Sequence, residues 1–410
     1  MIRPPAIRRP LANLSHLECS ECRQTYEVAL RNLCPKCGRP LLARYDLDRV
    51  RREDLVARAD LWRYLPLLPL DSVDGAFPLG EGGTPLLRCR NLEKAVGVRE
   101  IHVKDESANP TGTFKARGMA VAVPMAKALG ATKLAVPSAG NAGSAMAAYA
   151  ARAGLDALVV MPRDTPLEIV RETAAFPARV FFVDGLITDA AAIVAEACHK
   201  LGYFSMATLQ EPYRVEGKKT MGYELWEQLG GLPDWVVFPT GGGTGVVGLW
   251  KAFEELRALG WHEGPSPKIA FVQAAGCAPL VRAFDEGREE AGEWKDTKTV
   301  APGLRVPRAI ADRLVLRAAR ATGGRGVAVA DEAMIAATAE LARSEGIHAC
   351  FEGGATLAAL RRLVADGHVK PDERVVLFNT GTGLKNPRAG MGAKIATVRS
   401  LSDLREKLGK

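Results

Sequence analysis

The sequence lacks the long apolar segment and the biased composition that mark a membrane or disordered protein. No uncharged stretch reaches the ~20 strongly apolar residues that a membrane span needs. The first residues are basic but have no apolar core and no small-residue cleavage site, so we expect a cytoplasmic protein. With 47% hydrophobic residues among 410, the chain has enough apolar mass for a folded core.

Charge of one sign is not concentrated anywhere in the chain. Lys and Arg outnumber Asp and Glu by 55 to 47, a net charge of +8 that is spread without long runs of like charge. This pattern does not require nucleic-acid binding, whereas a modest positive surplus favours an anionic small substrate or cofactor. We therefore expect a small-molecule partner, and neither a nucleic acid nor a membrane.

Cysteine is too scarce for a disulfide scaffold, because 410 residues contain only 8. Four of the eight form two CxxC pairs, Cys19 with Cys22 and Cys34 with Cys37. Each pair can direct two thiolates at one tetrahedral ion, so residues 1–44 are predicted to form a zinc-ribbon-like segment with a closed, structural site. The alternative is a knuckle without metal, whose thiols are free or disulfide-paired.

Regular alternation of strands and helices begins after residues 45–80, a partly proline-rich stretch predicted as a linker. Short β-branched runs such as KLAVP and WVVFP alternate with alanine-rich segments of helical period. This alternation predicts parallel sheets and an α/β catalytic region over residues 81–410. Ligands of such sheets bind at the carboxyl ends of the strands, where this sequence has its Gly, Ser, Thr and Asn.

The first candidate loop, Asn109–Gly118, is a polar turn that leads into a helix with Phe114 and Lys115 in its first turn. The positive end of a helix and partial desolvation both lower the pKa of a lysine toward the neutral amine that forms an imine. The alternative is an ordinary surface lysine.

The second loop, residues 138–144, follows the strand LAVP. Its N–H groups either bind a carboxylate or simply cap the next helix. The last strand, RVVLFN, leads to Thr380 in another glycine-rich turn, which is either part of the site or a plain strand-to-helix connection.

The third loop, Pro239–Gly248, is a nest of backbone donors suited to a phosphate. It contains GxGxxG at 243–248, which also suits a dinucleotide. The next strand, however, ends in Gln273 and Ala274, without the acidic residue that a dinucleotide site needs. The loop therefore favours a mononucleotide-sized phosphate.

Together these loops resemble the pyridoxal-phosphate enzymes of the tryptophan-synthase β family, also called fold type II. The segment NPTGTFK at 109–115 is close to that family's NPTGSFK, and the resemblance runs from about Gly80 to Arg388. It implies an α/β protein of two lobes with mostly parallel sheets, the smaller at roughly residues 110–215, that binds pyridoxal 5'-phosphate and forms a homodimer.

Within this family the chain is most similar to threonine synthases and their close relatives. The similar parts are the ribbon, the segment Glu211–Thr220 and the ending Thr380–Lys385. The chain departs from threonine synthases at Ala116 and Ala142, and in its phosphate loop.

The resemblance also implies a role for individual residues. Lys115 would hold the cofactor as an internal aldimine and then shuttle protons. The other cofactor contacts would come from Phe114 against the cofactor, Asn141 at its ring hydroxyl, Gly241, Gly242, Gly243, Thr244 and Gly245 at its phosphate, and Thr380 at its pyridine nitrogen. Ser138 and Asn141 would bind the substrate carboxylate. Arg214 would hold a phosphate leaving group, unless it forms a structural ion pair with Glu211 or Glu216.

The implied reaction is the conversion of O-phospho-L-homoserine and water to L-threonine and phosphate. A neutral Thr380 at the ring nitrogen suits elimination and replacement rather than transamination. The alternatives on the same fold are a threonine or serine ammonia-lyase and a β-replacement synthase acting on a phosphoserine-type substrate. A different class, a catalytically silent regulator that uses its ribbon for partner contacts, is disfavoured by the intact Lys115.

Overall fold

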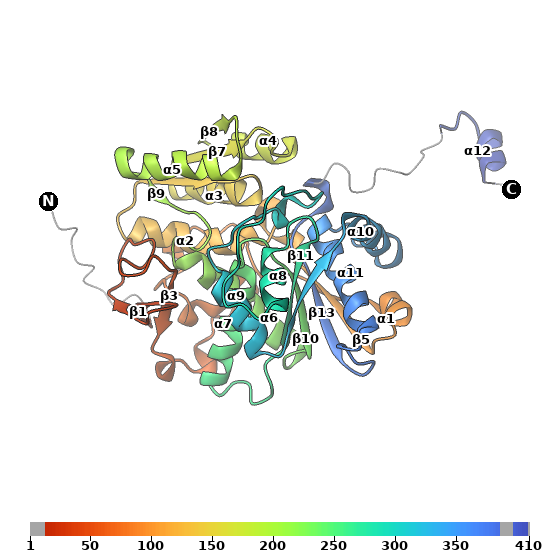
Figure 1. Cartoon of the computed structure of the whole chain (residues 1–410), viewed down its shortest axis with the longest axis horizontal. Coiled ribbons are helices and arrows are strands. Elements are labelled where there is room, and N and C mark those ends of the chain that lie inside the picture. The colour runs from red at the N-terminus through yellow and green to blue at the C-terminus, as the bar shows by residue number, and fades with distance from the viewer. Residues whose placement is uncertain (1–12, 386–396, 409–410) are drawn as a thin grey trace.

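Three β-sheets organise the chain in the computed structural model, which describes residues 13–385 and 397–408. A small antiparallel sheet has the order β2-β1-β3, a four-stranded sheet the order β8-β7-β6-β9, and a six-stranded sheet the order β12-β11-β10-β13-β5-β4. Figure 1 shows the four-stranded sheet and its helices as a separate upper lobe above the larger one. The expected α/β architecture of two lobes is confirmed.

The small lobe has a fully parallel sheet with helices packed on it. Its strands are β6 (Lys133–Pro137), β7 (Asp156–Pro162), β8 (Ala178–Val183) and β9 (Phe204–Ser205). Its helices are α2 (Lys115–Ala128), α3 (Asn141–Ala153), α4 (Leu167–Ala175) and α5 (Ile187–Leu201). The alanine-rich sequence of α3 is mostly buried, because small side chains let it pack closely on the sheet and on α2.

The large lobe is a parallel sheet with one antiparallel edge strand, β4. Its strands are β4 (Leu86–Arg88), β5 (Glu100–Asp105), β10 (Trp235–Pro239), β11 (Lys268–Ala274), β12 (Arg325–Val329) and β13 (Arg374–Asn379). Its helices are α1 (Arg90–Val96), α6 (Tyr213–Leu229), α7 (Thr244–Ala258), α8 (Pro279–Asp285), α9 (Asp312–Ala321), α10 (Asp331–Glu345) and α11 (Phe351–Ala365). A further helix, α12, spans Leu401–Lys407.

Successive residues of the central strand β10 belong to two different cores. Val237 packs in a cluster with residues of α10 and α11, whereas Val236 and Phe238 pack in a cluster with residues of α7 and α9. Helices therefore cover both faces of the sheet, and this explains why its strands are continuous apolar runs rather than alternating ones.

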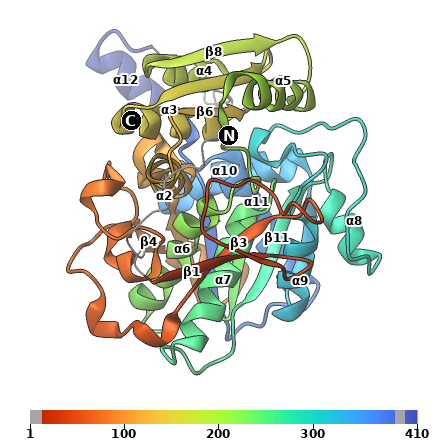
Figure 2. The ribbon, with the colours of Figure 1, turned by 90° about the vertical axis from the view of Figure 1, so that its left-hand side faces the viewer.

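The N-terminal sheet lies on the large lobe. It consists of β1 (Leu14–Cys19), β2 (Thr25–Tyr26) and β3 (Leu41–Tyr45), and Figure 2 shows it crossing the face that carries α7 and α9. Glu21 accepts hydrogen bonds from Arg313 (3.1 Å) and Arg317 (3.3 Å) of α9. Asn32 donates to the Ser205 carbonyl of the small lobe (3.0 Å), so this sheet contacts both lobes.

The segment predicted as a linker is folded against both lobes, because part of it packs with α2 and α3 and part with α6 and α7. It contains the short 3-10 helices η1 (Leu47–Arg49), η2 (Arg52–Asp54), η3 (Leu61–Leu67) and η4 (Asp74–Ala76). Four more 3-10 helices lie later in the described part of the chain: η5 (Glu106–Ala108), η6 (Pro110–Gly112), η7 (Pro302–Leu304) and η8 (Gly383–Lys385). Trp62 and Tyr64 are buried, and Trp62 donates to Glu81 at 2.6 Å. None of the helices in residues 13–385 and 397–408 has the length and apolar character of a membrane span.

Helix α6 is buried although its sequence is rich in charge. Lys219 pairs with Glu216 (2.8 Å) and Glu255 (2.9 Å), and Lys251 of α7 pairs with the same two carboxylates (2.8 and 2.7 Å). Two cations and two anions thus satisfy one another where α6 meets α7. At Gly217 a side chain would come within 1.8 Å of the Arg117 carbonyl, so glycine there lets α2 lie directly on α6.

Candidate active site

The loop before α2 is held against the turn that follows β13. The Phe114 N–H donates to the Thr380 carbonyl (3.1 Å), and the Thr382 N–H donates to the Gly112 carbonyl (2.9 Å). Lys115 is the first residue of α2, as the sequence predicts for a lysine in a first helical turn. This pairing of two distant loops places Lys115 at the carboxyl ends of β5 and β13, between the lobes.

The amine of Lys115 is a chemically unusual lysine. Burial and the nearby Arg214 guanidinium lower the pKa of Lys115 to about 8, against the opposing influence of Glu352 and Cys350. Its Nζ lies 4.2 Å from the centre of the Phe114 ring and donates to no acceptor among the described residues. A partly exposed, unpaired amine with this pKa is equipped to attack a carbonyl.

A second lysine lies on the same phenylalanine. Lys218 is fully buried, and its Nζ is 4.2 Å from the Phe114 ring centre and donates to the Phe114 carbonyl at 3.0 Å. Burial, with Lys115 and Arg214 adding to it, holds the pKa of Lys218 well below the ordinary value. The sequence does not mark this residue, because two adjacent lysines in a charged helix give no sign of which one is buried at the site.

Arg214 joins these lysines from the first turn of α6. Its Nη1 donates to the Met206 carbonyl (2.7 Å), while its buried Nε has no partner in the part of the chain that the structure describes. The structural ion pair with Glu211 or Glu216 does not form: Glu211 accepts the N–H groups of Tyr213 and Arg214, and Glu216 pairs with the two lysines of the α6–α7 cluster. Arg214 is therefore free to bind an anion.

The loop between β10 and α7 offers backbone donors. It turns at Gly243, where φ is +85°, and the N–H groups of residues 241–244 donate to no acceptor within residues 13–385. They point out of the N-terminus of a 15-residue helix, where the dipole favours an anion. At Gly245 a side chain would come within 2.2 Å of the Phe238 ring, so glycine is needed for the helix to start there. This nest fits a phosphate group.

The Ser138 hydroxyl forms hydrogen bonds within its own loop. Its hydroxyl accepts the N–H groups of Gly140 (3.2 Å) and Gly143 (2.9 Å) and donates to the Gly140 carbonyl (2.7 Å). The N–H groups of Asn141 and Ala142, at the start of α3, donate to no described acceptor and can receive a carboxylate. The N–H groups that Ser138 caps are therefore different from the N–H groups that could bind a carboxylate, so the loop can do both.

Thr380 lies beside two residues that the sequence analysis also missed, Cys350 and Glu352 at the start of α11. The Cys350 Sγ is 3.8 Å from the Thr380 hydroxyl, and burial raises the pKa of this thiol, so it stays uncharged. Glu352 accepts the Gly303 N–H at 2.8 Å. Nothing in the sequence near residue 350 marks these residues, since they reach the site only because α11 begins beside β13.

The predicted site residues thus gather at one edge of the two sheets. Lys115 follows β5, the Ser138 loop follows β6, the glycine nest follows β10 and Thr380 follows β13. The ring of Phe114 is 8% exposed and packs edge-on against Phe238 at 5.6 Å. A nucleophilic amine and a phosphate nest are what a pyridoxal-phosphate site requires, and free carboxylate donors and a buried guanidinium lie beside them.

The four ribbon cysteines form a separate cluster. Their Sγ atoms all lie within 4.8 Å of one another, with 3.4 Å between Cys19 and Cys37 and 3.7 Å between Cys22 and Cys34. Tetrahedral zinc with Zn–S bonds of about 2.3 Å spaces its sulfur atoms by about 3.8 Å. The arrangement therefore fits one tetrahedral ion.

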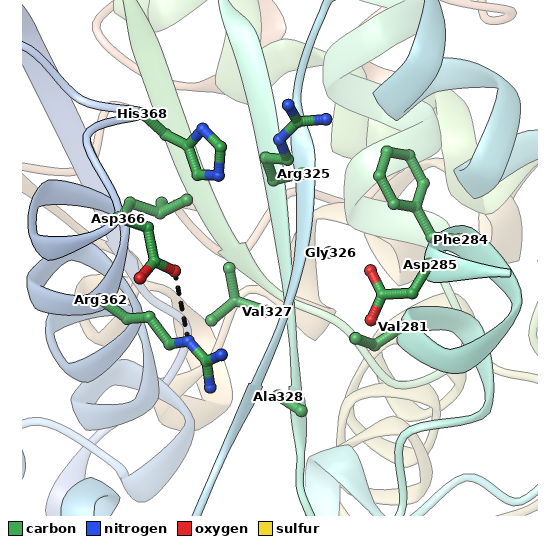
Figure 3. Close-up of a pocket in the computed structure, with 11 residues that line it drawn as sticks. Val281, Phe284, Asp285, Arg325, Gly326, Val327, Ala328, Arg362, Asp366 and His368 are labelled. Carbon is green, nitrogen blue, oxygen red and sulfur yellow. Dashed lines mark hydrogen bonds and ion pairs between the residues drawn. The ribbon is translucent and has the colours of Figure 1, made fainter. Parts of the chain in front are cut away.

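A cavity of about 420 Å³ lies away from these groups, between α8, β12 and α11 (Figure 3). Arg325, Asp285 and His368 line it, and Arg362 pairs with Asp366 at 3.4 Å. The cavity runs along the edge strand β12, where Arg325, Gly326, Val327 and Ala328 line it, and not at the loops where such sheets bind ligands. We therefore assign the active site to the Lys115 edge.

Comparisons with known proteins agree with this assignment. The model of the family "Pyridoxal-phosphate dependent enzyme" matches residues 77–381. A threonine synthase of Methanocaldococcus jannaschii is 35% identical over 94% of this chain and 96% of its own length. A threonine synthase of Methanosarcina acetivorans is 35% identical over 91% of this chain and 93% of its own.

Solved structures of lower identity share the fold. Maize serine racemase has a TM-score of 0.64 at 20% identity and covers 80% of this chain and 91% of its own. Threonine deaminase isoform 2 of Solanum lycopersicum has a TM-score of 0.63 at 21% identity and covers 80% of this chain and 82% of its own. At these identities the likeness concerns the fold alone. The sequence relatives are closer, and by them the chain belongs to the pyridoxal-phosphate dependent enzymes and, within that family, to the threonine synthases.

Proposed function

We propose that the chain converts O-phospho-L-homoserine and water to L-threonine and phosphate, using pyridoxal 5'-phosphate held at Lys115. The observation that carries this proposal is an unpaired Lys115 amine whose pKa is lowered by a nearby, buried Arg214 guanidinium with an unpartnered Nε. When bound, the cofactor supplies an electron sink that stabilises a carbanion next to it.

The residues of the chain would divide the remaining work. The free N–H groups of residues 241–244 hold the cofactor phosphate, and Lys115 binds the cofactor carbonyl and afterwards moves protons with its amine. Thr380, a neutral group, would contact the ring nitrogen, as the family resemblance implies. The Ser138 loop holds the substrate carboxylate through the N–H groups of Asn141 and Ala142.

Arg214 selects the phosphorylated substrate. A guanidinium without a carboxylate partner, inside a buried site, gains most from a dianion such as a phosphate ester. It keeps the leaving phosphate bound while the C–O bond at the substrate γ-carbon breaks and water adds at the β-carbon. Lys218 adds a second nitrogen, fully buried, over the Phe114 ring.

Four further features belong to this proposal. The ribbon cysteines bind one structural zinc, which is supported by the spacing of their sulfur atoms. The enzyme is a homodimer, as the family resemblance implies, it works in the cytoplasm, and its substrate is a phosphorylated amino acid. Light scattering on the purified protein tests the dimer.

The activity is tested by incubating purified protein with O-phosphohomoserine and quantifying phosphate, threonine and 2-oxobutyrate in the same tube. The proposal expects phosphate and threonine in equal amounts. Production of 2-oxobutyrate from added threonine, without phosphate release, would instead assign the ammonia-lyase activity. Turnover of a phosphoserine-type substrate alone would assign the β-replacement synthase.

A further inference from the structure

Lys385 holds together three segments that meet beside the active site. It lies in η8, at the end of the glycine-rich turn after β13, and its Nζ donates to the Thr111 carbonyl (2.6 Å), to Asn141 Oδ1 (3.1 Å) and to Glu172. Thr111 belongs to the loop that precedes Lys115, whereas Asn141 begins α3 and Glu172 lies in α4 of the small lobe. One ammonium group thus joins the large lobe, the lysine loop and the small lobe.

The ammonium group dictates which end of the Asn141 amide faces it. A lysine ammonium has three donors and no acceptor, so only the amide oxygen of Asn141 can point toward Lys385. The amide NH₂ must then point away, and Nδ2 has no acceptor among the described residues. A free donor is left on the side of Asn141 opposite to Lys385.

The backbone of the loop before Lys115 is strained at Thr111, the residue whose carbonyl accepts a hydrogen bond from Lys385. Thr111 has φ +57° and ψ +20°, a left-handed conformation that a β-branched residue avoids. Such strain persists only where the surroundings hold the backbone in place. The hydrogen bond from Lys385 to the Thr111 carbonyl is one such restraint, four residues before Lys115.

We propose that Lys385 is a positioning residue that aims the Asn141 amide donor at the ring oxygen of the cofactor and fixes the Lys115 loop at the same time. The inference rests on the proposed function and on the family resemblance, which implies that the Asn141 side chain lies at the cofactor ring hydroxyl. The donated hydrogen bond favours the ionised ring oxygen and so lowers the pH at which the bound ring hydroxyl ionises. Without Lys385, the Asn141 amide is free to rotate and the donor is lost.

The test is a pH titration of the absorbance of the bound cofactor, together with cofactor affinity, in wild type and Lys385→Met. We expect the variant to bind the cofactor about tenfold more weakly and to shift the ionisation constant of the ring hydroxyl about tenfold toward higher pH, as for loss of one hydrogen bond to a charged group. Lys385→Arg, which keeps a cationic donor, should restore much of both properties.

The matched control is Arg305→Gln. Arg305 pairs with Asp164 across the same two lobes at 2.8 Å but does not touch Asn141, so this variant removes an inter-lobe ion pair only. It should leave cofactor affinity and the titration unchanged. An Asn141→Ala chain should show the raised titration, and adding Lys385→Met to it should raise it no further, because the positioned group is already gone.

The inference would be overturned if Lys385→Met bound the cofactor and titrated as wild type does, or if Arg305→Gln changed both properties equally. It would also be overturned if the shifts caused by Lys385→Met and Asn141→Ala added fully in the double variant. If Lys385→Met does not fold, Lys385→Gln is measured with the same expectations and the same contradicting results. The titration needs no substrate, so it decides the role of Lys385 even if the wild type fails to act on O-phosphohomoserine. That failure would overturn the proposed function alone.

Discussion

Lys115 and Lys218 lie at the same distance from the Phe114 ring, but their amines differ in their partners. Lys218 donates to the Phe114 carbonyl, whereas Lys115 has no acceptor among the described residues. We expect borohydride to fix the cofactor to Lys115 in wild type and to leave no reducible adduct in Lys115→Ala, which peptide mapping checks. A reducible adduct that persists on Lys218 would contradict the assignment.

The lowered pKa of Lys115 makes cofactor capture depend on pH. Its pKa is about 8 rather than the ordinary 10.5, so the neutral amine accumulates as pH rises through 8. The rate at which cofactor-free protein captures pyridoxal phosphate should therefore rise with a midpoint near pH 8. Arg214→Leu removes a cation that lowers the pKa of Lys115, so its midpoint should move upward. An unmoved midpoint in this variant would show that Arg214 does not act on the amine.

Arg214 also bears on substrate choice. Losing a charge-assisted contact to a phosphate should cost about 2–3 kcal/mol, on the order of a hundredfold in kcat/KM for O-phosphohomoserine. Arg214→Leu should show this loss while it still forms the Lys115 adduct and keeps its Tm within a few degrees. Measuring kcat/KM on O-phosphohomoserine and on threonine separates the cases, because equal losses on both would point to a structural role.

At the scale of elements, the sequence predicts the strands and loops well because both obey local rules. The apolar runs become β5, β6, β7, β8, β10, β11 and β13, and each glycine-rich loop lies at the carboxyl end of its strand as a parallel sheet requires. Local rules therefore predict the strands and the loops, whereas the two-lobed fold and the roles of the site residues follow only from the family resemblance.

The sequence cannot show which charged residues are buried, since that depends on partners far along the chain. The stretch EGKKT in α6 has the composition of a solvated helix face, yet it is buried because Lys219 and Glu216 pair with Lys251 and Glu255 of α7. For the same reason, the sequence does not reveal that Lys218 and Cys350 are buried at the site, or that Lys385 contacts Glu172.

The glycine nest before α7 gives a prediction about an element. Gly243 has φ +85°, and a side chain there would lie 2.6 Å from Val315, so Gly243→Ala should lower the free energy of unfolding by about 2 kcal/mol and weaken cofactor binding. Gly292→Ala, where the nearest atom is a flexible arginine tip at 3.8 Å, is the control and should be nearly neutral. Chemical denaturation and cofactor titration check both variants.

The N-terminal sheet yields a second prediction at this scale. Cys34→Ser should lose about one zinc per chain by elemental analysis and lower Tm, because the metal orders the sheet that packs on α9 through Glu21. The cofactor spectrum should stay close to wild type, since no ribbon cysteine lies in the Lys115 site. Metal-free protein from a preparation without chelator would contradict the zinc site.

For the whole molecule, the lobes come together along the edge where their strands end. Lys115 enters from the loop after β5, Arg214 from the chain that returns from the small lobe, and Lys385 ties the last large-lobe turn to α4. A site built from both lobes exists only when the whole chain is folded, which explains why no single motif in the sequence identifies the substrate.

The most direct test of the central claim follows oxygen during turnover of O-phosphohomoserine in isotopically labelled water. If phosphate leaves by C–O cleavage and water adds to the β-carbon, the label should appear in the threonine hydroxyl, and the released phosphate should stay unlabelled at early times. Label in the phosphate, with homoserine as the product, would mean simple phosphate-ester hydrolysis and would contradict the account.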